Sequence, residues 1–213
     1  MRPLLLLCLL ASTLARAQQS TTSSSEQSSS SPTRGAAAQG KVPSVVERAS
    51  QKVTIPTAQI PLRTLEGKDV RLGDYDAKVV VVSLWATITP DHSFLGVLEQ
   101  LHQSYKGRKD VVILAINVDQ PKNEEDLEVI RGIARQMGAT YPVLLDKELM
   151  LMALVNEKLN PGAAARNAFL IPPFLLFTRR FEQMEQPQWE EAETVEHQVK
   201  WLRQKVEAAR KRK

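Results

Sequence analysis

The sequence predicts an α/β fold, in which a central mixed sheet is flanked by helices. Short runs of β-branched and other apolar residues alternate with longer segments whose apolar residues recur at helical spacing. The order strand–helix–strand–helix–strand is typical of this fold class. Of the 213 residues, 43% are hydrophobic and 24% are charged, as expected for one globular domain with appendages. The formal net charge of +4 is too small to indicate a nucleic-acid partner.

The strands of this sheet are predicted from five stretches of the sequence. The run "AKVVVVSLWA" is apolar on both faces, as in a central strand that is covered on both sides. The stretch "PLRTLEGKDVRL" indicates two short strands around a turn at Glu66 and Gly67. The stretches "DVVILAINVD" and "TYPVLLD" predict two further strands, and "IPPFLLFTRRFEQ" predicts a final strand pair.

Helices are predicted between these strands. One helix follows the central strand, and its apolar face is formed by Phe94, Leu98, Leu101 and Tyr105. A second helix spans residues 123–138, with Asn123 as its N-cap, acidic residues in its first turn and Gly138 at its C-cap. A third spans residues 147–159 and stops before an Asn-Pro-Gly turn.

The first 17 residues are expected to be a signal peptide. A positive N-terminus precedes the apolar stretch "LLLLCLLASTL", and small residues favour cleavage after Ala17. An uncleaved anchor is the alternative. Cleavage would remove Arg2 and Arg16, which lowers the net charge from +4 to +2. It would also remove Cys8, the single cysteine of the sequence, so the mature chain would have no thiol.

Three further segments follow the expected signal peptide. Residues 18–52 form a Ser/Ala-rich tether with almost nothing apolar to bury, so we expect this tether to be disordered. Residues 53–188 form the folded domain. Residues 189–213 form a long amphipathic C-terminal helix that ends in a basic tail, "ARKRK".

The C-terminal helix has an apolar seam formed by Val195, Val199, Leu202, Val206 and Ala209. Trp201 adds aromatic surface beside it. The seam would either pack on the domain or dock a partner helix. The basic tail is either solvated or in contact with anionic lipid or a wall polymer.

The stretch "LEGKDVRLGDYDAKVVVVSLWATITP" resembles the start of a thioredoxin-fold protein of the TlpA-like and redoxin (AhpC/TSA-like) branch. In that branch a valine-rich strand is followed by Trp-Ala-Thr-Trp-Cys-x-x-Cys at a helix N-terminus, and Trp85, Ala86 and Thr87 match its first three positions. "YPVLLD" is similar to a later strand of the family. "LIPPFLLF" is similar to the strand entry that carries a cis-proline, which would be Pro172. The resemblance implies a thioredoxin-like fold over about residues 53–186.

This sequence departs from the family pattern at the redox motif. At the positions of Cys-x-x-Cys it has Thr89, Pro90, Asp91 and His92. Thiol–disulfide exchange needs one thiolate to attack a disulfide and a second thiol to release the mixed disulfide. A threonine hydroxyl and an imidazole supply neither sulfur. The family's redox activity therefore does not carry over to these four residues.

Other roles for the four residues follow from their chemistry. A hydrolytic triad of Thr89, Asp91 and His92 requires a base that touches the nucleophile, which neighbouring residues at a helix start do not favour. No ligand spacing for a metal stands out. The remaining interpretation is structural: Thr89 or Asp91 caps the helix, Pro90 lies in its first turn and His92 is solvated.

The sequence as a whole predicts an exported, non-catalytic binding or scaffold module of a cell envelope, periplasmic or extracellular. A protein or peptide partner would bind through a groove at Trp85, Ile171 and Pro172, since the residue before the family's cis-proline pairs with bound peptide, or through the C-terminal helix. No cofactor, metal or nucleic acid is expected. One alternative is a thiol–disulfide oxidoreductase or redoxin-type protein, as the resemblance implies. Another is a structural subunit of an envelope complex.

Overall fold

The structure is a computed structural model, and it describes residues 48, 55–166, 168–178, 180–187 and 194–212. The expected signal peptide (1–17) and almost all of the expected tether (18–52) lie outside the described residues. Among the residues that are described, none of the helices has the length and apolar character needed to cross a membrane.

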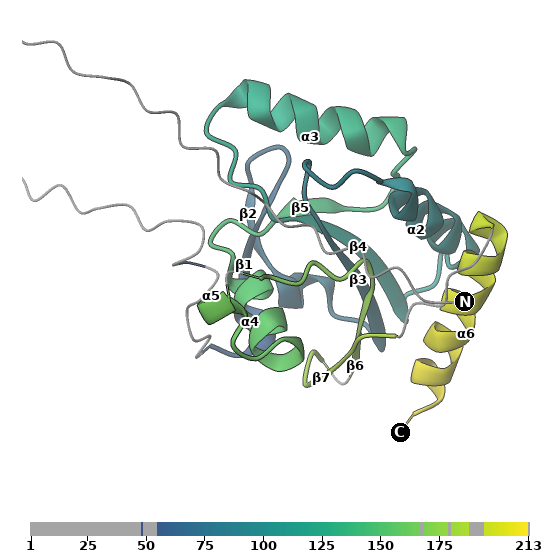
Figure 1. The fold of residues 1–213 in the computed structure, drawn as a ribbon. Coiled ribbons are helices and arrows are strands. Elements are labelled where there is room, and N and C mark those ends of the chain that lie inside the picture. The colour runs from purple at the N-terminus through teal and green to yellow at the C-terminus, as the bar shows by residue number, and fades with distance from the viewer. Residues whose placement is uncertain (1–47, 49–54, 167, 179, 188–193, 213) are drawn as a thin grey trace, which may run out of the picture. The chain divides into compact units, whose positions relative to one another are not determined.

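A single mixed sheet forms the centre of the described chain (Figure 1). Its strands lie in the order β2-β1-β5-β4-β3-β6-β7. The strands β3, β4 and β5 are parallel to one another, and the other neighbours pair antiparallel. The predicted mixed sheet is confirmed. The bounds are β1 Pro61–Thr64, β2 Asp69–Arg71, β3 Val79–Trp85, β4 Val111–Asn117, β5 Val143–Leu145, β6 Leu175–Thr178 and β7 Gln183–Glu185.

Strand β3 divides the core into two clusters, because side chains along a strand alternate between its faces. All seven of its residues are buried. Val79, Val81 and Trp85 belong to the first cluster, which lies under the helices α2, α3 and α6. The intervening residues Val80, Val82 and Leu84 belong to the second cluster on the opposite face. A run that is apolar at every position except Ser83 thus reflects a strand covered on both sides, as predicted.

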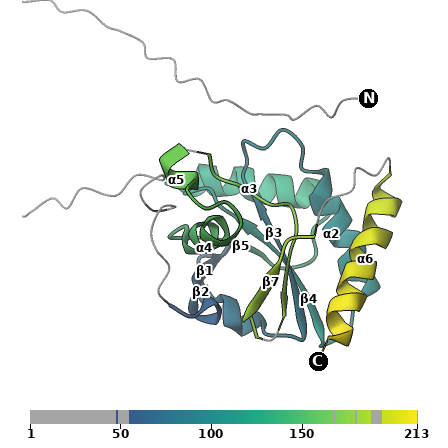
Figure 2. The same ribbon diagram turned by 60° about the horizontal axis from the view of Figure 1, so that its bottom comes forward.

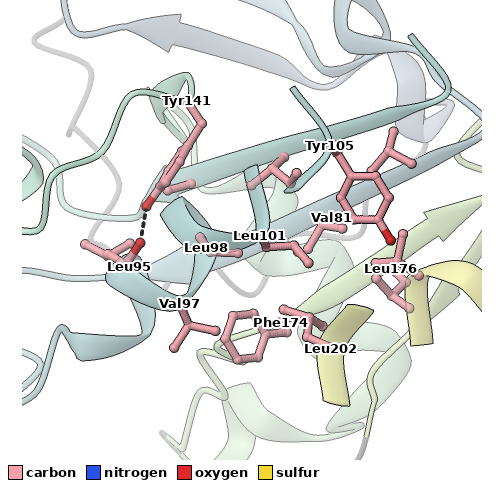
Figure 3. Close-up of a cluster of buried hydrophobic side chains, with 14 of the residues drawn as sticks. Val81, Leu95, Val97, Leu98, Leu101, Tyr105, Tyr141, Phe174, Leu176 and Leu202 are labelled. Carbon is pink, nitrogen blue, oxygen red and sulfur yellow. Dashed lines mark hydrogen bonds between the residues drawn. The ribbon is translucent and has the colours of Figure 1, made fainter. Parts of the chain in front are cut away.

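Helices α2 (Ser93–Ser104), α3 (Glu124–Gln136) and α6 (Val195–Lys211) cover the first face of the sheet. Helix α4 (Met150–Leu159) covers the second, with the 3₁₀ helices at Thr57–Gln59 and Leu72–Tyr75. The short helix α5 (Ala163–Arg166) follows α4 (Figure 2). Figure 3 shows side chains of β3, α2 and α6 meeting in the first cluster.

The predicted N-cap of α3 is confirmed, whereas its C-cap is Met137, one residue before the predicted Gly138. The Oδ1 of Asn123 accepts a hydrogen bond from the backbone N–H of Asp126 at 2.9 Å, so this N-cap satisfies one of the free N–H groups of the first turn. Gly138 has a φ of 72°, the left-handed conformation that glycine adopts without strain just after a helix.

The C-terminal helix is shorter than predicted. Thr194 has an extended backbone and its side chain accepts from the N–H of His197 at 3.2 Å, so the helix begins at Val195 rather than at residue 189. Residues 189–193 lie outside the described residues.

The apolar seam of α6 packs on the domain, beside α2 (Figures 1 and 2). Leu202, Val206 and Ala209 of the seam are buried, as is Trp201 beside it, whereas Val195 at the start of the helix is exposed. The hydroxyl of Tyr105 donates to Glu207 at 2.8 Å. The guanidinium of Arg210 donates to Asp110 at 2.9 Å. Of the two expected roles for this seam, the structure supports packing on the domain.

Candidate functional site

The candidate site begins at the turn between β3 and α2, which holds Thr89, Pro90, Asp91 and His92. The helix begins at Ser93, so Pro90 lies before its first turn rather than within it, which corrects the prediction. Asp91 is exposed, and its carboxylate accepts from the backbone N–H of Ser93 at 2.8 Å and from its hydroxyl at 2.9 Å. These two bonds lower the pKa of Asp91. The exposed carboxylate therefore stays ionised at neutral pH.

His92 is half-buried, and the prediction that it is solvated is wrong. Its Nε2 lies 3.1 Å from the carbonyl oxygen of Ala86, so Nε2–H donates to that oxygen. The ring also packs edge-on against Trp85, with the ring centroids 5.6 Å apart. His92 thus closes the turn against the end of β3. Because Nε2–H donates to the carbonyl of Ala86, Nε2 does not act as a base toward the hydroxyl of Thr89.

Trp85 packs against His92 of the turn, and its side chain does not line the pocket beside the turn. The residue has no exposed surface, and its indole N–H finds no hydrogen-bond partner in the part of the chain that the structure describes. Trp85, which was predicted as a contact residue of the groove, is not among the residues that line the pocket beside the turn.

The other side of the turn is fixed by Asp119, which follows β4. Its carboxylate accepts from the N–H of Thr87 at 2.7 Å and from the side-chain amide of Asn117 at 2.9 Å. Among the described residues, no group of three or more His, Cys, Asp and Glu side chains gathers as a metal site would require.

The loop that leads into β6 faces the turn. Every peptide bond of the described residues is trans. The prediction of a cis bond before Pro172 is therefore wrong. The trans form, which X-Pro bonds favour intrinsically, is compatible with a sheet-like contact in which the carbonyl of Pro172 accepts from the N–H of Leu84 at 3.2 Å. Pro172 is itself buried.

The residues on either side of Ile171 have their backbone fixed. Both the N–H and the C=O of Leu170 bond to the side chain of Asn156, at 2.7 and 3.0 Å. Pro172 is held by Leu84. Between them, Ile171 is half-buried, and within the described part of the chain neither its N–H nor its C=O is hydrogen-bonded.

A pocket of about 250 Å³ lies between the turn and this loop. The turn and Ile171 therefore line the same pocket. The pocket is lined by Leu84, Thr89, Asp91, Phe94, Ile171 and Pro173. Pro173 takes the lining position that was expected for Pro172. Phe94 was predicted only as core, although its place at the start of a helix beside the turn could have indicated exposure.

The comparisons with known proteins agree with this fold. The AhpC/TSA family model matches residues 52–174. A thiol-disulfide oxidoreductase ResA of Geobacillus kaustophilus is 28% identical over 111 residues, which is 52% of this chain and 60% of the relative. A ResA of Halalkalibacterium halodurans is 32% identical over 89 residues, 41% of this chain and 47% of the relative. The matches thus span about half to three-fifths of the length of these relatives.

Solved structures show the thioredoxin-like fold alone, because their sequence identity is low. A secreted disulfide oxidoreductase of Mycobacterium tuberculosis, homologous to DsbE of Escherichia coli, has a TM-score of 0.50 and 14% identity over 71% of this chain and 97% of its own. A putative electron transport protein of Aquifex aeolicus has a TM-score of 0.51 and 15% identity over 73% and 96%. Since the family model covers more than half of its length, the chain belongs to the AhpC/TSA family.

Proposed function

We propose that this chain is a thioredoxin-like binding module that holds an extended polypeptide segment without a covalent or redox step. The observation that carries the proposal is the backbone of Ile171, whose N–H and C=O have no partner among the described residues and lie beside a pocket of about 250 Å³. An extended segment pairs with such groups as an added strand would. The ligand class is therefore a protein or peptide in extended conformation.

The pocket supports this ligand class through its shape and chemistry. Its walls are mainly apolar, from Leu84, Phe94, Ile171 and Pro173, and its rim carries Thr89 and the ionised Asp91. A volume of about 250 Å³ accommodates one large apolar side chain of a bound segment. The carboxylate at the rim favours a ligand with a cationic group next to that side chain.

The absence of a redox step rests on the sequence. Cys8 is the single cysteine, and it lies outside the described residues. An exchange reaction at the turn would need two sulfurs at positions that hold Thr89 and His92. The imidazole of the half-buried His92 bonds to the carbonyl of Ala86 and packs against Trp85. His92 therefore acts as a structural element of the turn.

Thiol–disulfide exchange is the second candidate function, because the curated relatives carry the name thiol-disulfide oxidoreductase. An insulin-reduction assay with the purified full chain separates the two candidates. We expect turnover at the background rate. Turnover above background that survives Cys8→Ser would contradict the binding module.

The same assay on Thr89→Cys/His92→Cys tests whether the turn retains the geometry of a redox motif. The substituted thiols would lie at the start of α2, where a helix N-terminus favours a thiolate. We expect insulin reduction to appear in this variant and to be absent from Thr89→Cys alone, which lacks the resolving thiol.

Binding is tested with a permanently unfolded, carboxymethylated polypeptide, which offers extended segments and no free thiol. Two-dimensional NMR of the ¹⁵N-labelled full chain should show the largest shift changes at Ile171, Thr89 and Phe94. The proposal would be contradicted by chemical-shift changes confined to α6, or by the absence of any shift change at a millimolar concentration of the probe. The buried seam of α6 makes this helix a weaker candidate for the contact surface.

We also propose that the chain is exported. The supports are the apolar stretch within residues 1–17 and the likeness to a secreted structural relative. Mass spectrometry of the protein from its native host should give a chain that begins at or near Gln18. A chain that retains residues 1–17 would contradict cleavage and would keep Cys8 in the mature protein.

A further inference from the structure

Asn156 is a buried polar residue that follows the apolar run of helix α4. It lies on α4, where Leu151 to Val155 are all buried and apolar, and only 3% of its own surface is exposed. Every hydrogen-bonding group of its amide is used. Nδ2 donates to the carbonyls of Met152 at 2.9 Å and Leu170 at 3.0 Å, and Oδ1 accepts from the N–H of Leu170 at 2.7 Å.

This side chain takes the place of a neighbouring strand. It pairs with both backbone groups of Leu170, which is how the next strand of a sheet would hold that residue. On the other side of Ile171, the carbonyl of Pro172 is held by Leu84. Ile171 is therefore fixed at both ends while its own backbone groups stay unpaired within the described residues.

We propose that Asn156 is a positioning residue for ligand binding, because its amide fixes Leu170 so that Ile171 presents its N–H and C=O to an extended segment. The inference rests on the proposed function and identifies what holds its binding edge in place. Asn156 does not touch the ligand. It acts on the site through Leu170, which lies 14 residues further along the sequence.

An asparagine is the side chain that meets these requirements. Aspartate keeps the acceptor for the N–H of Leu170 but loses both donors. Leucine has a similar volume but leaves the N–H and C=O of Leu170 without partners, which a buried site penalises. Asn160, at the end of the same helix, also bonds this loop, through the carbonyl of Ala168 at 2.7 Å. It acts two residues further from Ile171 and leaves Leu170 untouched.

The first test is amide hydrogen exchange of the ¹⁵N-labelled full chain by NMR. In the wild type the Leu170 amide should be protected and the Ile171 amide should exchange rapidly. In Asn156→Leu the exchange of Leu170 should accelerate by about tenfold or more, since its only acceptor is gone. Val155→Ala is the matched control, because it removes buried volume from the same turn of α4 but no hydrogen bond. It should lower the melting temperature and change Leu170 exchange less than about twofold.

The second test is affinity for the carboxymethylated unfolded polypeptide. Asn156→Leu should raise the dissociation constant by about tenfold, and Val155→Ala and Asn160→Ala by less than about twofold. Where Asn156→Leu does not fold, Asn156→Asp replaces it. In that variant Leu170 stays protected through its N–H, while the freed carbonyl should still weaken binding by about threefold.

The outcomes separate the two proposals. Wild-type affinity in a folded Asn156→Leu or Asn156→Asp variant overturns the positioning role alone and leaves the binding module intact. Equal losses of affinity in Val155→Ala and Asn156→Leu also overturn it, because general destabilisation would then explain both. A wild-type chain that binds no probe overturns the proposed function and the positioning role together.

Discussion

The junction between β5 and α4 and the junction between β3 and α2 both place an aspartate at the start of a helix, but in opposite environments. Asp146 follows β5, has no exposed surface, and accepts from the N–H groups of Leu151 at 3.3 Å and Met152 at 2.8 Å. Asp91 precedes α2, is exposed, and bonds only to Ser93. One carboxylate is enclosed by the helix that it caps, and the other faces solvent.

The difference separates a junction that stabilises the fold from one that is open to a ligand. Around Asp146, neighbouring groups are paired: Asn117 accepts from its N–H, and Gln120 donates to its carbonyl at 3.0 Å. Around Asp91, the carboxylate lines a pocket of about 250 Å³. A ligand can approach the second junction without displacing a core contact.

Asp146→Ala should be the most destabilising substitution at either junction. It removes the acceptors for two buried N–H groups of α4, and such groups are costly to leave unpaired. At pH 5 we expect the free energy of unfolding to fall by about 3 kcal/mol. Urea denaturation monitored by circular dichroism measures it. A loss no larger than that of Asp91→Ala would remove the contrast between the junctions.

The two carboxylates should respond to pH with opposite signs. Burial raises the pKa of Asp146 to about 6, although its hydrogen bonds to Met152 and Leu151 oppose the rise. The native state therefore holds this proton more tightly than the unfolded chain, and the contribution of Asp146 to stability falls as pH rises from about 4 to about 6. The hydrogen bonds of Asp91 lower its pKa, so its contribution is lost as pH falls below about 4.

Denaturation of the wild type and of Asp146→Asn between pH 4 and pH 7 measures the first effect. The unfolding free energy of the wild type should decline by about 2 kcal/mol relative to the variant over this range, since one unit of pKa shift corresponds to about 1.4 kcal/mol. Parallel profiles for the two proteins would show that Asp146 does not titrate in this window.

His92→Ala should have an intermediate effect at the open junction. It removes the hydrogen bond to Ala86 and the edge-on contact with Trp85. We expect a loss of about 1 kcal/mol in unfolding free energy. The variant should also show a larger acrylamide quenching constant for its tryptophan fluorescence, because the His92 ring packs against Trp85. An unchanged quenching constant would mean that other residues shield the indole.

Asp91→Ala should have the smallest effect on stability. The carboxylate is exposed and its two bonds go to one neighbouring residue, so we expect a loss of about 0.5 kcal/mol. The same variant should lose affinity for unfolded polypeptides that carry lysine or arginine, and Asp91→Asn should lose it equally. If affinity for a neutral polypeptide drops as much, the role of the charge at the rim is refuted.

The sequence predicted the elements whose signals are local. The run around β3 is apolar at almost every position, with Ser83 as the exception, which indicates a strand covered on both faces. Asn123 precedes an amphipathic segment with acidic residues, which indicates a helix start. The family resemblance placed a groove at Trp85, Ile171 and Pro172, and Ile171 does line a pocket beside the turn that follows Trp85.

The features that were missed depend on contacts between distant residues. Nothing near Asn156 in the sequence indicates that it pairs with Leu170, although an asparagine directly after a run of seven apolar residues was a signal that it bonds to another group. The trans bond before Pro172 accompanies a contact with Leu84 that no local pattern contains. His92 became half-buried because its ring meets Trp85 and Ala86, which depends on how the turn closes.

The packing of α6 has a consequence for how the chain folds during synthesis. The contact between Tyr105 and Glu207 joins residues 102 positions apart, and that between Asp110 and Arg210 joins residues 100 apart. Closing such long loops lowers the entropy of the chain before the contacts that offset this cost have formed. While the ribosome has yet to release residues 195–211, the apolar side of α2 that these residues cover remains exposed to water and to other nascent chains. A holding chaperone would therefore find its binding surface on α2 of the growing chain, and lose it when α6 docks.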